Sequence, residues 1–377
     1  MSGLVPGMGS KAPQLEPFAK GSTEYPTPIN GSGANMAAGA AGGNTSVLTP
    51  IPKTGYVSFL RHTIAGTLTI GTVATTAYVP PLHRLISNYN LSNSLNYPYR
   101  NLNGDDVWAW ANFTTGRGEQ DPIYGSKTLV APSMTTLGAQ PFAFTFVDRI
   151  GQNDGVNFAR FLLSALTTSN DLTISVSWLP FSGLSALQQN GCVISAYTAT
   201  DTVSAMYMTV PNPQKYFQPN TGIVQQVLGD PTFNNPQQGV NAVNLTPIQG
   251  PEFLGLGVQV VDSGGAVDSL VPGTSGISQI EILVNGTVPI KTWSLSDVIS
   301  KYEELFGRMP SYGYLYLDMS SDLSIPNVMS HVHRKVLSTA KYAQITVQVT
   351  LNSNFTAGAG AKINLLKRTQ QRYAGNG

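Results

Sequence analysis

The chain contains few charged residues and a single cysteine. Asp, Glu, Lys and Arg make up 11% of its 377 residues, less than half of the roughly one quarter that is usual in soluble domains. The 21 basic and 20 acidic residues leave a formal net charge of +1, so we expect no sequence-specific nucleic-acid partner. Cys192 alone cannot form an intrachain disulfide or a multi-cysteine metal cluster, and we expect it to be buried.

Signals for secretion and membrane insertion are also missing. The N-terminal residues lack the basic start and apolar core of a secretory signal. The longest apolar-rich stretches, such as 253–261, are far too short to cross a bilayer. We therefore expect a protein that is synthesised in the cytoplasm.

Motifs of catalysis are absent from the sequence. It contains no G-x-S-x-G elbow, no phosphate-loop lysine motif and no complete dinucleotide-binding glycine loop. His331-Val332-His333 is the pattern closest to a metal site, since alternate strand positions point to one face. No spacing supplies a third ligand, so His331 and His333 are only weak metal candidates. We expect no catalytic residue, cofactor or metal, and hence no enzyme.

Short stretches that alternate apolar and polar residues fill most of the chain after residue 56. Such alternation predicts strands with one buried face, for example at 63–70, 85–95 and 172–178. The 38 glycines and 25 prolines punctuate these stretches. The pattern 158–166 fits either a helix or a broken strand. The sequence predicts an all-β protein.

One order of elements occurs twice, at 84–178 and at 277–349. Each copy contains an alternating strand, a short helix, an aromatic strand, an irregular connector and a closing strand. The expected helices span 105–112, after the possible cap Asn103, and 294–306, where Ser294 caps the start. The distance between the copies is too long for a solenoid repeat. Two similar tandem domains are therefore expected.

The composition predicts four segments. They are a flexible, Gly- and Ala-rich arm (1–50), a first domain (51–199), a second domain (200–357) and a basic tail (358–377). We also expect two long loops, 114–141 and 211–251, to carry contacts.

The expected tail contains four basic residues, Lys362, Lys367, Arg368 and Arg372. They are either a solvated chain end or a contact for phosphate, from lipid head groups or from packaged nucleic acid.

Two tandem all-β domains with inserted helices, the segment Tyr312-Gly313-Tyr314-Leu315-Tyr316-Leu317-Asp318 and a terminal alternating strand occur together over 56–355. This combination resembles the double jelly-roll major capsid proteins of tectivirus-type phages and related icosahedral viruses with an internal membrane. The resemblance implies two eight-stranded jelly rolls and three copies per pseudo-hexagonal capsomer. It also implies location in the virion after synthesis in the host cytoplasm, and no active site. The implied partners are the chain itself, penton and minor capsid or membrane proteins, and lipid head groups.

An alternative is a carbohydrate-binding β-sandwich protein of the spike or receptor-binding type. In this interpretation four aromatic residues form a stacking platform for sugars, namely Tyr97, Tyr99, Trp108 and Trp110. A β-sandwich hydrolase ranks last, because the sequence shows no paired carboxylates.

Overall fold

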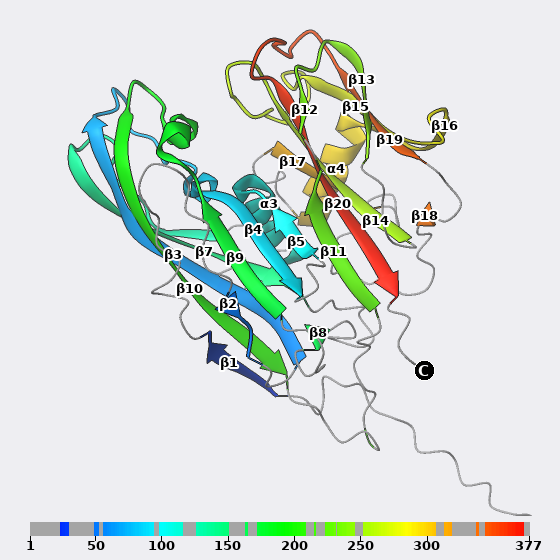
Figure 1. Ribbon diagram of the computed structural model, residues 1–377. Coiled ribbons are helices and arrows are strands. Elements are labelled where there is room, and N and C mark those ends of the chain that lie inside the picture. The colour runs from blue at the N-terminus through cyan, green and yellow to red at the C-terminus, as the bar shows by residue number, and fades with distance from the viewer. Residues whose placement is uncertain are drawn as a thin grey trace, which may run out of the picture.

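The computed structural model describes residues 23–29, 49–52, 56–93, 98–115, 126–150, 163–164, 172–208, 215, 223–230, 232–245, 252–306, 313–318, 337–338 and 344–372. These residues form two β-sandwiches side by side (Figure 1). Among them, no helix is long and apolar enough to cross a membrane.

The first sandwich, called roll 1, pairs a six-stranded sheet with part of a ten-stranded sheet. The six-stranded sheet contains β1 (Glu24–Pro28), β10 (Val193–Met208), β3 (Tyr56–Thr72), β7 (Gly138–Arg149) and β6 (Lys127–Val130), with β8 (Leu163–Ser164) beside β3. The facing strands are β5 (Pro98–Leu102), β4 (Ile86–Asn93), β9 (Leu172–Trp178) and β2 (Thr49–Pro50). Its helices are α3 (Gly104–Thr115) and two 3₁₀ turns, η1 (Leu82–Leu85) and η3 (Phe181–Leu187).

The second sandwich, roll 2, pairs the rest of the ten-stranded sheet with a four-stranded sheet. The former contributes β17 (Tyr314–Asp318), β14 (Glu252–Val261), β20 (Lys362–Arg372) and β11 (Ile223–Gly229), with the short β12 (Phe233–Asn234) and β18 (Leu337–Ser338). The latter contains β13 (Gly239–Asn244), β19 (Ile345–Leu351), β15 (Ile277–Val284) and β16 (Val288–Ser294), and α4 (Leu295–Phe306) follows β16.

The two rolls have the same strand order. Roll 1 reads β1-β10-β3-β7 opposite β5-β4-β9-β2, and roll 2 reads β11-β20-β14-β17 opposite β16-β15-β19-β13. The helix follows β5 in one roll and β16 in the other. The expected duplication, the all-β fold and both expected helices are therefore confirmed.

The match between the rolls extends to a β-bulge. Both the β4–β5 and the β15–β16 ladder shift register beyond the third residue before the helix cap, which is Asn103 in roll 1 and Ser294 in roll 2. The rungs on either side of the shift are Leu91–Arg100 and Ser92–Pro98 in roll 1, and Ile282–Lys291 and Leu283–Pro289 in roll 2. Because a bulge re-aims the residues that follow it, equivalent residues of the two rolls occupy equivalent places.

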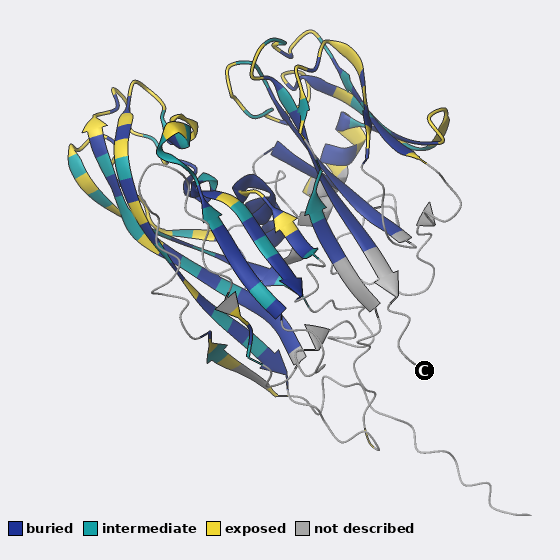
Figure 2. Ribbon diagram, in the orientation of Figure 1, coloured by how far each residue is buried: buried dark blue, intermediate teal, exposed yellow. Residues whose placement is uncertain are grey.

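Each roll has its own hydrophobic core, seen as dark blue strands in Figure 2. Strand β17 contributes to both cores: Leu315 and Leu317 pack in roll 2, whereas Tyr314 and Tyr316 pack against roll 1. Side chains alternate across a strand, so the sheet of roll 2 is buried on both faces where α3 lies against it.

Two expected boundaries are wrong. The expected break after residue 199 falls inside β10, whose whole length pairs with β3 of roll 1. The expected tail contains β20, which pairs with both β11 and β14. The strand β20 resembles a basic tail because the partners that bury Lys367 and Arg368 lie far away in the sequence, and such tertiary contacts override local composition.

The two expected loops also contain strands. The stretch 114–141 includes β6 and the start of β7, and 211–251 includes β11, β12 and β13. Of the stretch 158–166, only 163–164 lies within the described residues, as the strand β8.

Candidate functional site

The basic residues expected in a free tail lie in a central strand instead. Lys367 and Arg368 are buried, and Lys367 Nζ lies 2.7 Å from Asp230 Oδ1. Lys362 is the first residue of β20, and Arg372, paired with Ile223, is the last. Because Lys367 and Arg368 are enclosed by their own chain, they cannot contact lipid head groups or nucleic acid as expected for a tail.

The weak metal candidates His331 and His333 lie outside the described residues. Within the part of the chain that the structure describes, no three His, Cys, Asp or Glu side chains gather to hold a metal ion.

The other two histidines each contact a buried carboxylate. His62 Nδ1 lies 2.7 Å from Asp201 Oδ2, and His83 Nε2 lies 2.8 Å from Asp105 Oδ1. The His62 ring stacks on Phe146 at 4.4 Å, and both His62 and Asp201 have no exposed surface. The His62–Asp201 pair is therefore a structural contact that a substrate cannot reach.

The expected aromatic platform for sugars is not on the surface. Trp108 and Trp110 of α3 are buried, as is Tyr99 of β5, and Tyr97 lies outside the described residues. Stacking on a sugar requires an exposed ring face. The platform interpretation is therefore wrong for these three residues, which instead belong to the core of roll 1.

Trp110 joins the two rolls. Its side chain is 1% exposed, and the guanidinium groups of Arg100 from roll 1 and Arg368 from roll 2 lie 5.9 and 5.6 Å from the ring. The ring of Tyr316 meets it edge-on at 6.2 Å, and Arg368 Nη1 donates to Tyr316 Oη at 3.2 Å. Cation–π contacts gain strength when water is excluded. The buried indole therefore links Arg100 of roll 1 to Arg368 and Tyr316 of roll 2.

Arg100 is fixed by a buried network in roll 1. Its Nε donates to Asp148 Oδ1 at 2.9 Å, and Tyr89 Oη donates to Asp148 Oδ2 at 2.9 Å. Burial and the nearby Asp148 raise the pKa of Tyr89 well above its usual range. The ion pair is thus satisfied by hydrogen bonds on both carboxylate oxygens, as a buried pair requires.

Asp106 is the second polar link between the rolls. Asn103 Oδ1 accepts from the Asp106 N–H at 2.9 Å, while Asp106 Oδ2 accepts from the Asn103 N–H at 3.1 Å, which caps α3. Tyr314 Oη of roll 2 donates to Asp106 Oδ1. Burial raises the pKa of Asp106 to about 7, although the hydrogen bond from Tyr314 opposes the rise.

This raised pKa predicts that the protein loses stability as the pH rises from about 4 to about 7. Below the unfolded pKa, Asp106 is protonated in both states; between the two values only the folded state holds the proton, so stability falls by up to roughly 1.4 kcal/mol per pH unit. Asp106→Asn should flatten the slope measured by urea unfolding across this range. An unchanged slope in the variant would show that other groups cause it.

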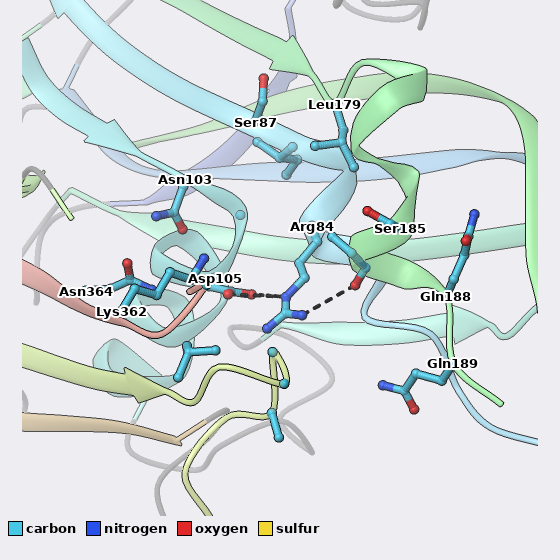
Figure 3. A pocket seen from close by; sticks show the side chains of 18 residues that line it. Arg84, Ser87, Asn103, Asp105, Leu179, Ser185, Gln188, Gln189, Lys362 and Asn364 are labelled. Atoms are coloured by element: carbon cyan, nitrogen blue, oxygen red, sulfur yellow. Dashed lines mark hydrogen bonds and ion pairs between the residues drawn. The ribbon is translucent and has the colours of Figure 1, made fainter. Parts of the chain in front are cut away.

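A cleft of about 740 Å³ opens where the two rolls meet (Figure 3). Roll 1 lines it with Arg84, Asp105 and Gln188, and roll 2 lines it with Lys362 and Asn364. Arg84 Nε donates to Asp105 Oδ1 at 3.0 Å. Burial alone would raise the pKa of Asp105, but the contacts with His83 and Arg84 outweigh it and hold that pKa well below its usual range. Because the cleft walls belong to both rolls, the shape of the cleft depends on the junction between the rolls, where Trp110 and Asp106 contact Arg368, Tyr316 and Tyr314.

Sequence reasoning missed the residues that form this junction. Only the spacing of Asn103 and Asp106 signalled a helix cap. The partners Tyr314, Tyr316 and Arg368 lie about two hundred or more residues further along the chain, and no local pattern relates them to α3.

Comparisons with known proteins agree with this architecture. No protein-family model and no curated protein sequence matches the chain. The atomic structure of Sulfolobus turreted icosahedral virus contains a similar chain, with 15% identity and a TM-score of 0.58, covering 93% of this chain and 92% of that one. A chain of the PBCV-1 virus capsid is 11% identical with a TM-score of 0.55, and the match covers 93% of this chain and 93% of that one. The major capsid protein of bacteriophage PM2 is 10% identical with a TM-score of 0.50, and the match covers 94% of this chain and 100% of that one. The chain therefore has the double jelly-roll fold found in these viral capsid proteins.

Proposed function

We propose that this protein is a major capsid protein, and that three copies form the pseudo-hexagonal capsomers of an icosahedral shell. The observation that carries the proposal is the register-matched pair of rolls, which spans nearly the full length of chains that build viral capsids. Six similar rolls from three copies would tile a hexagonal outline.

The surface chemistry supports a structural role. The outer face of the β10-β3 sheet carries a row of uncharged side chains that are exposed or half-buried, namely Thr63, Ala65, Thr67, Thr198, Thr200 and Thr202. A row of uncharged, mostly hydroxyl-bearing side chains suits broad contact with another protein. The buried histidines and the inaccessible aromatic residues favour neither catalysis nor sugar binding.

The proposal also assigns an inner end to the capsomer. β1 and the end of β20 lie at one end of the molecule, and the start of β20 lies toward the other (Figure 1). Lys362, the first residue of β20, lines the inter-roll cleft. We place the β1 end toward the interior of the virion, where penton, minor capsid or membrane proteins and lipid head groups of an internal membrane would be partners. Of Lys362, Lys367, Arg368 and Arg372, only Arg372 is at the β1 end of the molecule, as the last residue of β20.

Native mass spectrometry and electron microscopy of the purified protein test this proposal. We expect a particle of three times the 40.1 kDa chain mass with a hexagonal outline. A monomer that binds glycans on an array would contradict the capsid proposal and restore the carbohydrate-binding alternative.

A further inference from the structure

The two rolls of one chain are joined by a short parallel strand pairing. Val227 and Leu228 of β11 lie opposite Arg100 and Asn101 of β5. This pairing makes one ten-stranded sheet out of strands from both rolls.

Each of these two strands has an equivalent in the other roll. β1 pairs antiparallel with β10 as β11 does with β20. The Ile29 N–H donates to the Val203 C=O at 3.0 Å, and the Asp230 N–H donates to the Leu365 C=O at 2.8 Å at the same point of the ladder. β1 is therefore the equivalent of β11, and Thr27 corresponds to Leu228.

β16 is the equivalent of β5, because both pair with the preceding strand through the same bulge and both lead into the helix. Counting back from the helix caps Asn103 and Ser294, Thr292 corresponds to Asn101.

Both equivalent strands end their sheets. Among the described residues, β1 is one edge of the six-stranded sheet and β16 is one edge of the four-stranded sheet. They lie on opposite outer sides of the molecule (Figure 1). One chain therefore offers, on two different surfaces, the two halves of a contact that it already makes internally.

We propose that β16 of one copy lies parallel to β1 of the next copy, in the register of β5 on β11, so that Thr292 is opposite Thr27. The contact rests on the proposed capsomer and specifies how its copies meet. It is heterologous, with a different surface on each side, and such contacts form a closed ring when the rotation between copies closes. Three copies linked in this way alternate internal and intermolecular versions of one pairing around the ring.

The sequence of β1 restricts which strands can pair with its open edge. Since the Ile29 N–H points to β10, strict alternation turns positions 28 and 26 toward the open edge, and both are proline. Proline removes N–H donors and protects an edge strand from arbitrary pairing. The carbonyl groups remain as acceptors, and a contact as short as the two-residue β11–β5 pairing can use them.

A disulfide cross-link tests the proposed register. Opposite residues on neighbouring strands are close enough for a disulfide, so Thr27→Cys/Thr292→Cys should give covalent trimers on a non-reducing gel after mild oxidation. Each single variant should stay monomeric on that gel, because Cys192 is buried. The matched control Thr27→Cys/Val240→Cys places the second thiol on β13, at the other edge of the same sheet, and should not cross-link.

The outcomes separate this inference from the proposed function. A native trimer in which the Thr27→Cys/Thr292→Cys variant fails to cross-link, or in which the β13 control cross-links equally, overturns the strand pairing and leaves the capsomer intact. A chain that is monomeric by native mass overturns both.

A charge test gives a second measurement that needs no oxidation. Thr27→Glu/Thr292→Glu places like charges opposite each other and should weaken the trimer about tenfold or more, whereas Thr27→Lys/Thr292→Glu should restore it. Equal trimer dissociation for the two double variants would overturn the proposed register.

Discussion

Replacing Trp110 with alanine is expected to lower the free energy of unfolding by about 3–5 kcal/mol, the usual cost of removing a fully buried tryptophan. The side chain is 1% exposed and packs between Arg100 and Arg368. The substitution opens a cavity at the junction and also removes the ring from two buried guanidinium groups. Chemical unfolding followed by circular dichroism measures the loss.

Two controls define this result. Trp110→Phe retains an aromatic face and should cost clearly less, whereas Val79→Ala, at a residue 64% exposed, should stay within about 0.5 kcal/mol of the parent. If Trp110→Ala were as stable as Val79→Ala, the indole would not hold the rolls together.

Replacing Arg100 with methionine is expected to cost about 3–5 kcal/mol, because it leaves the Asp148 carboxylate buried without its cation. Asp148 is 3% exposed. The substitution removes its hydrogen bond from Arg100 and leaves the one from Tyr89. Methionine fills much of the volume of arginine, so the lost charge rather than a cavity dominates the effect. Urea unfolding at neutral pH measures it.

A double variant separates the lost ion pair from the lost packing. In Arg100→Met/Asp148→Asn the neutral amide needs no cation, so part of the stability should return, and the coupling between the two sites should exceed about 1 kcal/mol. Additive effects of the two substitutions would contradict a stabilising ion pair between Arg100 and Asp148.

The sequence predicted those elements whose signals are local. The closing strand of roll 1 alternates cleanly from Leu172 to Trp178 and is β9. The second helix begins after Ser294, whose Oγ accepts from the Asp297 N–H at 3.2 Å. Periodicity and capping depend on neighbouring residues, so both could be found without a structure.

What the sequence could not show depends on partners far along the chain. β20 contains Lys367 and Arg368, whose sequence resembles a solvated tail. In the fold, Asp230 forms an ion pair with Lys367, and Trp110 covers the guanidinium group of Arg368. The burial of Trp110 likewise follows from the position of roll 2. Such residues are determined by tertiary contacts, which override local composition.

The equivalence of β1 with β11 was also hidden. Glu24–Pro28 contains two prolines and shows no strand alternation, and only its pairing with β10 reveals its place in the repeat. The order of elements in the sequence predicted the duplication. Which residues of the two rolls are equivalent could be determined only from the pairing of the strands.

A reconstruction of the native oligomer by electron cryomicroscopy tests the central claim most directly. It should show a closed ring of three chains with six rolls at pseudo-equivalent positions and β16 of each chain beside β1 of the next. A monomer, or a two-fold dimer that joins identical surfaces, would contradict it.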